Sequence, residues 1–301
     1  MLEKYFEELR KELETRNAKD SQEILSYFEE IVNDHLDNGE SEESIIASLG
    51  SVEQLADIIC EKQTTKETIP HEQHLERRTF SGISKINIDV NAYDIVIEGT
   101  DEEEGYLEYN YSDDVYLEVN IGNNKISIEE ESSGTIVESF FTKMLSLKGR
   151  SFQGRLHVCF PKDKMFDLCI DSVSGDVKIS DIKCDEIELE TVSGDIEVSN
   201  IFTKDLNMDT VSGEVDSQDI TTNDAFKAQS VSGDLNFKHL KCDEITIETV
   251  SGDVDLSVDG NMGDYNIHEE SLRKNVSYES KGNKSLEIET VSGDISYRFL
   301  S

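Results

Sequence analysis

The chain of 301 residues has no tryptophan, 2 prolines, and only 28 basic side chains against 66 acidic ones. The scarcity of proline excludes a proline-rich stalk. A net charge of −38 repels nucleic-acid phosphates and anionic lipid headgroups, so we expect no nucleic-acid partner. Residues 1–70 carry 7 basic and 18 acidic side chains, so the charge is not confined to a tail. It favours a basic protein surface or a cationic peptide as partner, or it serves solubility alone.

The sequence also lacks closely paired cysteines and long apolar runs. The five cysteines form no CxxC pair, so neither a disulfide framework nor a zinc site is expected, and most should be small buried residues. No run of about 18 apolar residues suggests a transmembrane helix. The charged N-terminus has no apolar core of the kind that a secretory signal needs. The expected location is therefore cytoplasmic, or membrane-associated through a partner.

Motifs of catalysis and cofactor binding are also missing. The sequence has no G-x-S-x-G, phosphate-binding loop, HExxH or dinucleotide fingerprint. His71 and His74 have HxxH spacing, but neither a cysteine nor a confident helix accompanies them. We therefore expect a non-enzymatic protein without a cofactor. A glycan-active enzyme that uses acidic residues on a solenoid groove is the alternative.

Apolar residues recur at helical spacing in the first 60 positions. The first stripe consists of Leu2, Tyr5, Phe6, Leu9 and Leu13, and the second of Ile24, Tyr27, Phe28, Ile31 and Leu36. A short helix through Ile45 and Leu49 should end at Gly50, and Ser51 with Gln54 makes a capping box for another. These patterns predict a small all-α bundle of three or four helices over residues 1–63.

The run NGESEESIIASLGSVEQLA, from Asn38 to Ala56, resembles the HAAS-type signalling module of Gram-positive bacteria. Val52 stands where that family usually has proline, at the first turn of a helix. Members of the family are encoded near PadR-type regulators or fused to envelope-associated domains. The resemblance implies signalling through protein contact, with an envelope-stress or PadR-type regulatory system as the partner.

Residues 64–78 are predicted to be a linker, and residues 79–301 a β body. Within the β body, the string Val-Ser-Gly-Asp/Glu occurs six times. Its glycines are Gly175, Gly194, Gly213, Gly233, Gly252 and Gly293. The spacings are 19, 19, 20, 19 and 41 residues, and the last is interpreted as two periods with one degenerate repeat inside.

Apolar residues alternate on both sides of each repeat glycine. Ile187 and Leu189 precede Gly194, for example, and Ile196 and Val198 follow it. A period of two inside a period of about 19 predicts two short strands per repeat, each with one buried face. Stacked repeats bury those faces together. We predict a mainly β fold, a β-helix-like solenoid of about 19-residue repeats, regular from about residue 161 and capped by the irregular segment 79–160.

The repeat tips are the first candidate site. We expect each tip glycine to adopt a positive φ at a corner, with Ser and Asp side chains bonding nearby backbone. Stacking in register would align the carboxylates of Asp176, Asp195, Glu214, Asp234, Asp253 and Asp294. A structural turn motif is the favoured interpretation, and weak Ca²⁺ binding between adjacent tips is the alternative.

Residues 140–155 break the acidic trend and are the second candidate site. The segment has no acidic side chain and four basic ones, Lys143, Lys148, Arg150 and Arg155. It either covers the end of the solenoid or contacts a membrane surface or the acidic helical module.

The repeats resemble the bacterial "putative adhesin" β-repeat family, in which SGD-tipped repeats follow a strand ending in proline, as Phe160-Pro161 does here. Combined with the HAAS-like part, the chain resembles LiaX-like envelope-stress proteins of Firmicutes. The resemblance implies a non-enzymatic regulatory protein of the envelope-stress response that acts through protein contacts. The alternative is a surface adhesin or ligand-binding protein recognising cationic peptides or envelope components, and it keeps surface exposure open.

Overall fold

The computed structural model divides into two compact units, the first including Met1–Gln73 and the second His74–Tyr111, Leu117–Glu130 and Gln153–Ser301. The residues that it describes are 2–16, 18, 25, 32, 41–56, 59, 74–111, 115–132, 154–272 and 274–300. Among the described helices, none combines the length and the apolar character that crossing a bilayer requires.

The first unit has a helical core. Helices α1 (Leu2–Thr15) and α3 (Glu42–Leu49) contribute to one buried apolar cluster that also includes Leu25, Leu55 and Ile59. The capping box is confirmed, because Ser51 Oγ accepts from the Gln54 N–H at 3.2 Å and Gln54 Oε1 from the Ser51 N–H at 3.3 Å. Most of residues 17–40 lie outside the described part, so the number of helices in the bundle stays a prediction.

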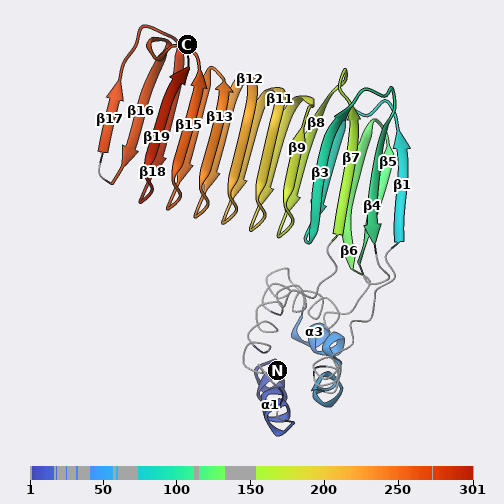
Figure 1. The fold of residues 1–301 in the computed structure, drawn as a ribbon. Helices are drawn as coiled ribbons and strands as arrows, with labels where there is room; N and C mark the ends of the chain where they lie inside the picture. The colour runs from blue at the N-terminus through green and yellow to red at the C-terminus, as the bar shows by residue number, and fades with distance from the viewer. Residues whose placement is uncertain are drawn as a thin grey trace. The chain divides into compact units, whose positions relative to one another are not determined.

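The second unit is a β-solenoid, which confirms the predicted mainly β fold (Figure 1). The 19 strands of the described residues belong to one hydrogen-bonded sheet that wraps around the core. Each coil crosses the solenoid twice, once on the face before the repeat glycine (face 1) and once on the face after it (face 2). The strands pair with their counterparts in the neighbouring coils, mostly in parallel.

Face 1 contains, in spatial order, β6 (Lys125–Ser132), β2 (Lys85–Val90), β8 (Met165–Ser172), β10 (Lys183–Thr191), the second halves of β11 (Ile196–Thr210) and β12 (Val215–Ser230), β14 (Glu244–Thr249), β18 (Lys284–Thr290), β16 (Tyr265–Ser271) and β17 (Lys274–Tyr278).

Face 2 contains, in spatial order, β1 (His74–Phe80), β4 (Gly105–Tyr111), β7 (Gly154–Pro161), β3 (Tyr93–Thr100), β9 (Val177–Ser180), the first halves of β11 and β12, β13 (Leu235–Lys241), β15 (Val254–Asp259) and β19 (Ile295–Leu300). A further strand, β5 (Val115–Gly122), is joined to β6 by a tight turn with positive φ at Asn123 and Asn124.

At the N-terminal end, the order of strands in space departs from the order along the chain. The coil formed by β2 and β3 lies between the coil of β6 and β7 and the coil of β8 and β9. The sequence predicted that regular stacking begins at about residue 161. In the structure, two further coils stack in parallel before that point, the coil of β6 and β7 and the coil of β2 and β3. The linker is also corrected, because β1 begins at His74 and pairs with β4 as far as Phe80. Residues 64–73 lie outside the described part.

The C-terminal end contains a second departure from chain order. Strands β18 and β19 pair directly with β14 and β15, so the repeat of Gly293 stacks on that of Gly252. The intervening residues form the short 3-10 helix η1 (Met262–Asp264) and the antiparallel hairpin of β16 and β17, which lies beyond β18. The predicted degenerate repeat is therefore wrong, since the extra residues cap the stack instead of adding a coil to it.

The core lies between the two faces and is filled by the inward-pointing half of each strand. One row on face 1 runs through Ile187, Leu206, Phe226, Ile245 and Leu286, which are at most 2% exposed. Burying a side chain of this size stabilises a fold by about 1.5–3 kcal/mol. Because each strand buries only every second residue, the outward residues form parallel columns along the solenoid.

The two corners of a coil use different devices. At the corner after face 2, the backbone takes positive φ at Asp181 (58°), Asn200 (52°), Asp219 (57°) and His239 (56°). Asn, Asp and His adopt this conformation more readily than other side chains. At the repeat tip, the expectation of a positive φ is wrong: among the described glycines, only Gly50 and Gly82 have one.

The tip glycines are required by the close approach of neighbouring coils. A Cβ added to Gly194 would overlap the carbonyl oxygen of Gly175, and one added to Gly213 would overlap that of Gly194. The same overlap recurs at Gly233, Gly252 and Gly293. Each tip thus rests on the backbone of the previous tip, in a glycine ladder that leaves no room for a side chain.

Replacing Gly194 by alanine should lower the free energy of unfolding by roughly 1–3 kcal/mol, as overpacking of a close contact does. The expected cause is displacement of the tip from Gly175, measurable by urea denaturation followed by circular dichroism. Gly263→Ala is the matched control, since a Cβ there meets no atom within 4 Å. Equal stability of the two variants would contradict the ladder as the reason for these glycines.

Candidate functional site

Each repeat tip satisfies its own backbone. The Gly194 N–H donates to Thr191 Oγ1 at 2.9 Å, and Ser193 Oγ donates to the Val173 carbonyl of the previous coil at 3.0 Å. The hydroxyl residue three positions before each glycine is buried along the whole ladder. These residues are Ser172, Thr191, Thr210, Ser230, Thr249 and Thr290.

The carboxylates predicted at the tips do align, and they bind backbone amides. The Asp195 N–H donates to Asp176 Oδ1 at 3.1 Å, and the Glu214 N–H donates to Asp195 Oδ1 at 2.9 Å. The same bond joins Asp253 to Asp234 at 2.9 Å and Asp294 to Asp253 at 2.8 Å. Four of the six carboxylates accept a backbone N–H in this way, as a turn motif requires, and the alternative of weak Ca²⁺ binding stays a prediction.

A longer column of acids runs along face 1, and six of its positions lie four residues before a repeat glycine. The strand registers place nine residues side by side, and eight of them are acidic. This acidic column consists of Glu129, Asp89, Asp171, Glu190, Asp209, Gln229, Glu248, Glu289 and Glu270. The column was not predicted from the sequence, although the recurring [D/E]-[T/S]-V-S-G string contained the signal.

A column of exposed valines lies beside the acids, at the position two residues before each repeat glycine. These side chains are 42–53% exposed, although their apolar character favours burial. The valine column consists of Val173, Val192, Val211, Val231, Val250 and Val291. It gives the edge of face 1 an apolar strip beside a negatively charged one.

The surface between the two columns is hollowed. One hollow of about 340 Å³ is lined by tip residues of neighbouring coils, of which Asp89 is the first in the sequence and Val211 the last. A second hollow of about 510 Å³ is lined in the same way, with Asp209 the first of its residues and Val291 the last. Both include Asp209 and Thr210, so they adjoin. The acidic column, the valine column and the buried hydroxyls between them form a groove that follows the coils, here called the tip groove.

Like charges crowd the acidic column. Partial burial raises the pKa of the Asp171 carboxyl, and the neighbouring carboxylates of Asp89 and Glu188 raise it further. Burial also raises the pKa of Glu190, with added repulsion from Asp171 and Asp209. The folded chain therefore holds unfavourable charge in this column that a cation would relieve.

The predicted basic patch is not assembled in the described part of the chain. Lys143, Lys148 and Arg150 lie outside the described residues. Arg155 lies on β7 of face 2, where its N–H donates to Asn110 Oδ1 at 2.5 Å and its side chain is exposed. The role expected for residues 140–155 stays a prediction.

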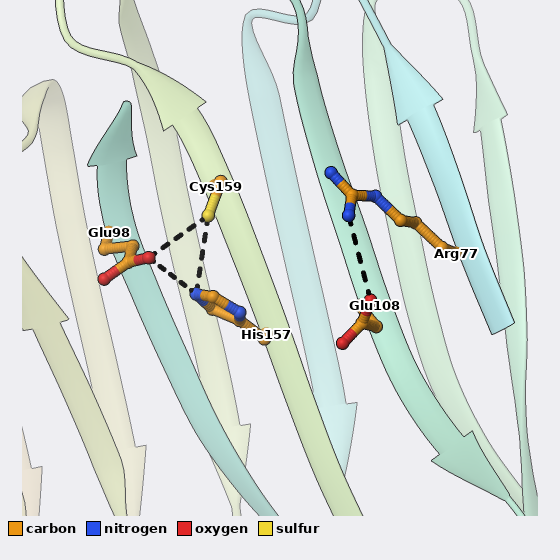
Figure 2. A network of polar contacts seen from close by, with 5 residues as sticks. All are labelled: Arg77, Glu98, Glu108, His157 and Cys159. Carbon is orange, nitrogen blue, oxygen red and sulfur yellow. Dashed lines mark hydrogen bonds and ion pairs between the residues drawn. The ribbon is translucent and has the colours of Figure 1, made fainter. Parts of the chain in front are cut away.

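A separate polar cluster lies on face 2 (Figure 2). Glu98 Oε1 is 3.0 Å from His157 Nε2 and 3.4 Å from Cys159 Sγ. Burial raises the pKa of the Cys159 thiol to about 11, and Cys159, Cys184 and Cys242 are buried as predicted. The cluster was not predicted from the sequence.

Comparison with protein families gives two matches. The family described as Toastrack DUF4097 matches residues 83–300, and the family described as HAAS matches residues 4–57. A comparison with the curated proteins found no match.

Solved structures to which this chain is similar include a "putative adhesin" from Bacteroides fragilis (12% identity, 75% of this chain and 97% of that one, TM-score 0.39). Others are a "putative adhesin" and a "putative lipid binding protein" from Parabacteroides distasonis. They share 10% and 14% identity over 77% and 76% of this chain and 98% and 97% of theirs, each with a TM-score of 0.40. The family match spans the described solenoid from before β2 to the end of β19, and this chain belongs to the Toastrack DUF4097 family.

Proposed function

We propose that this chain is a non-enzymatic interaction protein whose tip groove binds an extended cationic polypeptide. The observation that carries the proposal is the acidic column running beside the valine column across successive coils. Of the two functions expected from the sequence, the groove favours ligand binding.

The groove fits a polypeptide because its two walls attract different kinds of side chain. Carboxylates attract lysine or arginine, and the valines offer apolar surface to the stems of those side chains or to aliphatic residues. Coils repeat about every 4.8 Å, so a ligand lying along the groove meets a new carboxylate in nearly every coil. Such a ligand gains many weak contacts instead of one deep pocket.

Regulation of the envelope-stress response is the second candidate, and the HAAS match over residues 4–57 favours it. In this proposal the helical unit contacts a regulatory protein while the solenoid binds the ligand. The two candidates are compatible, because they use different units of the chain.

The groove is tested with a short fluorescent peptide of alternating lysine and valine. Fluorescence anisotropy should show binding to the full chain that weakens with salt. Replacing Asp171, Glu190 and Asp209 by their amides should weaken binding by roughly tenfold, since each exposed ion pair contributes up to about 1 kcal/mol.

The matched control removes the same charge from face 2, by the amide substitutions of Glu197, Asp216 and Asp255, which are exposed there. Binding to this variant should stay close to that of the parent chain. Equal losses in both variants would mean that only net charge attracts the peptide, and the groove assignment would fail.

The crowded acids also predict how stability depends on pH. Because the pKa of Glu190 is raised in the folded chain, its contribution to stability is complete below the unfolded value of about 4 and is lost as pH rises through the folded pKa. Glu190→Gln should therefore raise the melting temperature at pH 7, and the gain should vanish in acid. A gain that is independent of pH would contradict charge repulsion as its cause; Asp216→Asn on face 2 is the control.

A further inference from the structure

The polar cluster on face 2 is built by three strands that are not consecutive in the chain. The parallel pairing of β3 with β7 places Glu98 opposite Cys159, and the antiparallel pairing of β4 with β7 places Tyr106 on its other side. His157 precedes Cys159 by two residues on β7, so both side chains leave the same face of the strand. Figure 2 shows the side chains of Glu98, His157 and Cys159 converging.

The three converging atoms have the spacing of metal ligands. Glu98 Oε1 to His157 Nε2 is 3.0 Å, and Cys159 Sγ is 3.4 Å from each of them. A tetrahedral zinc ion with bonds of about 2.0–2.3 Å holds its ligand atoms roughly 3.3–3.7 Å apart. The triangle already matches one face of that tetrahedron to within a few tenths of an ångström, so closing it on an ion requires only small side-chain movements.

We propose that Glu98, His157 and Cys159 form a binding site for a divalent transition metal of the zinc class. One sulfur, one imidazole nitrogen and one carboxylate oxygen form a mixed ligand set that suits a borderline ion and disfavours calcium or magnesium. Three protein ligands leave the fourth position for water or a ligand. The site lies on face 2, apart from the tip groove, and is independent of the proposed function.

The surroundings hold the ligands in place and limit access to the thiol. Cys159 is 2% exposed, whereas the Glu98 side chain is 45% exposed and the His157 side chain 28%, so an ion enters past Glu98 and His157. The Tyr106 ring packs edge-on against the His157 ring, with 6.0 Å between the ring centroids, and Tyr106 lies opposite Cys159 in the pairing of β4 with β7. Residues that contact the metal ligands in this way orient them and tune the affinity for the metal.

Arg77 completes this arrangement from β1. Its guanidinium lies over the Tyr106 ring at 3.8 Å and forms an ion pair with Glu108 at 4.0 Å, as Figure 2 shows for the ion pair. The pairing with Glu108 offsets part of the positive charge that would otherwise oppose a cation nearby. Ion binding would expel the thiol proton and replace the hydrogen bonds among Glu98, His157 and Cys159.

A second group of potential ligands in the described residues, His268, Glu287 and Glu289, lacks a sulfur atom and lies in an acidic neighbourhood. It offers no comparable selectivity. The cluster around Cys159 is the one whose donor set and enclosure select an ion.

The test uses the full chain, freed of metal by a chelator and titrated with Co²⁺. Cobalt bound by a thiolate gives a near-ultraviolet charge-transfer band, which carboxylates on an acidic surface do not produce. We expect one cobalt per chain, with a band that zinc abolishes by displacement. Cys159→Ser should remove the band, and Glu98→Gln and His157→Gln should weaken cobalt binding by on the order of 100-fold.

Cys169→Ser is the matched control, because Cys169 is a half-buried thiol outside the cluster. The cobalt band of this variant should be the same as that of the parent chain. Glu98→Gln changes a half-exposed side chain, so it reports on the metal even if Cys159→Ser impairs folding. A metal-free hydrogen-bonded network would give no charge-transfer band. That outcome, or a band that persists in folded Cys159→Ser, would overturn the proposal.

Discussion

The contact of glycine on glycine at the repeat tips is the constraint on which the rest of the solenoid depends. Each tip passes so close to the previous one that no side chain fits, and the buried hydroxyls of Thr191 and its counterparts hold the amides of those glycines. This contact sets the register in which every coil meets the next. A slip by one residue would turn the buried half of each strand toward solvent.

A fixed register turns every outward position into a column. Residues that are 19 positions apart in the sequence, such as Glu190 and Asp209, become direct neighbours across paired strands. The acidic column, the valine column and the amide-capping carboxylates are therefore products of the same stacking. The groove needs no dedicated loops, and its charge costs some stability, as the raised pKa values of Asp171 and Glu190 show.

The repeat period and the alternation of buried residues could be predicted from the sequence because they recur along the chain. The capping box at Ser51 could be predicted because its two residues are only three positions apart. The role of the tip glycines could not, since their steric partner is a carbonyl group one coil away. The segment with the β16–β17 hairpin resembled a degenerate repeat because the 41 residues between Gly252 and Gly293 are close to two periods. Glu98 and Cys159 could not be paired from the sequence, because β3 meets β7 only after the chain has formed β4, β5 and β6.

The direct stacking of the Gly293 repeat on the Gly252 repeat, with 41 residues between the two glycines, has a consequence for how such a surface changes in size. Each coil presents its neighbours with much the same interface, so whole coils can be added or removed while the remaining contacts persist. The groove lengthens in steps of about 4.8 Å. Duplication of a single repeat therefore lengthens the acidic column and the valine column by one position each, while the coils on either side keep their contacts.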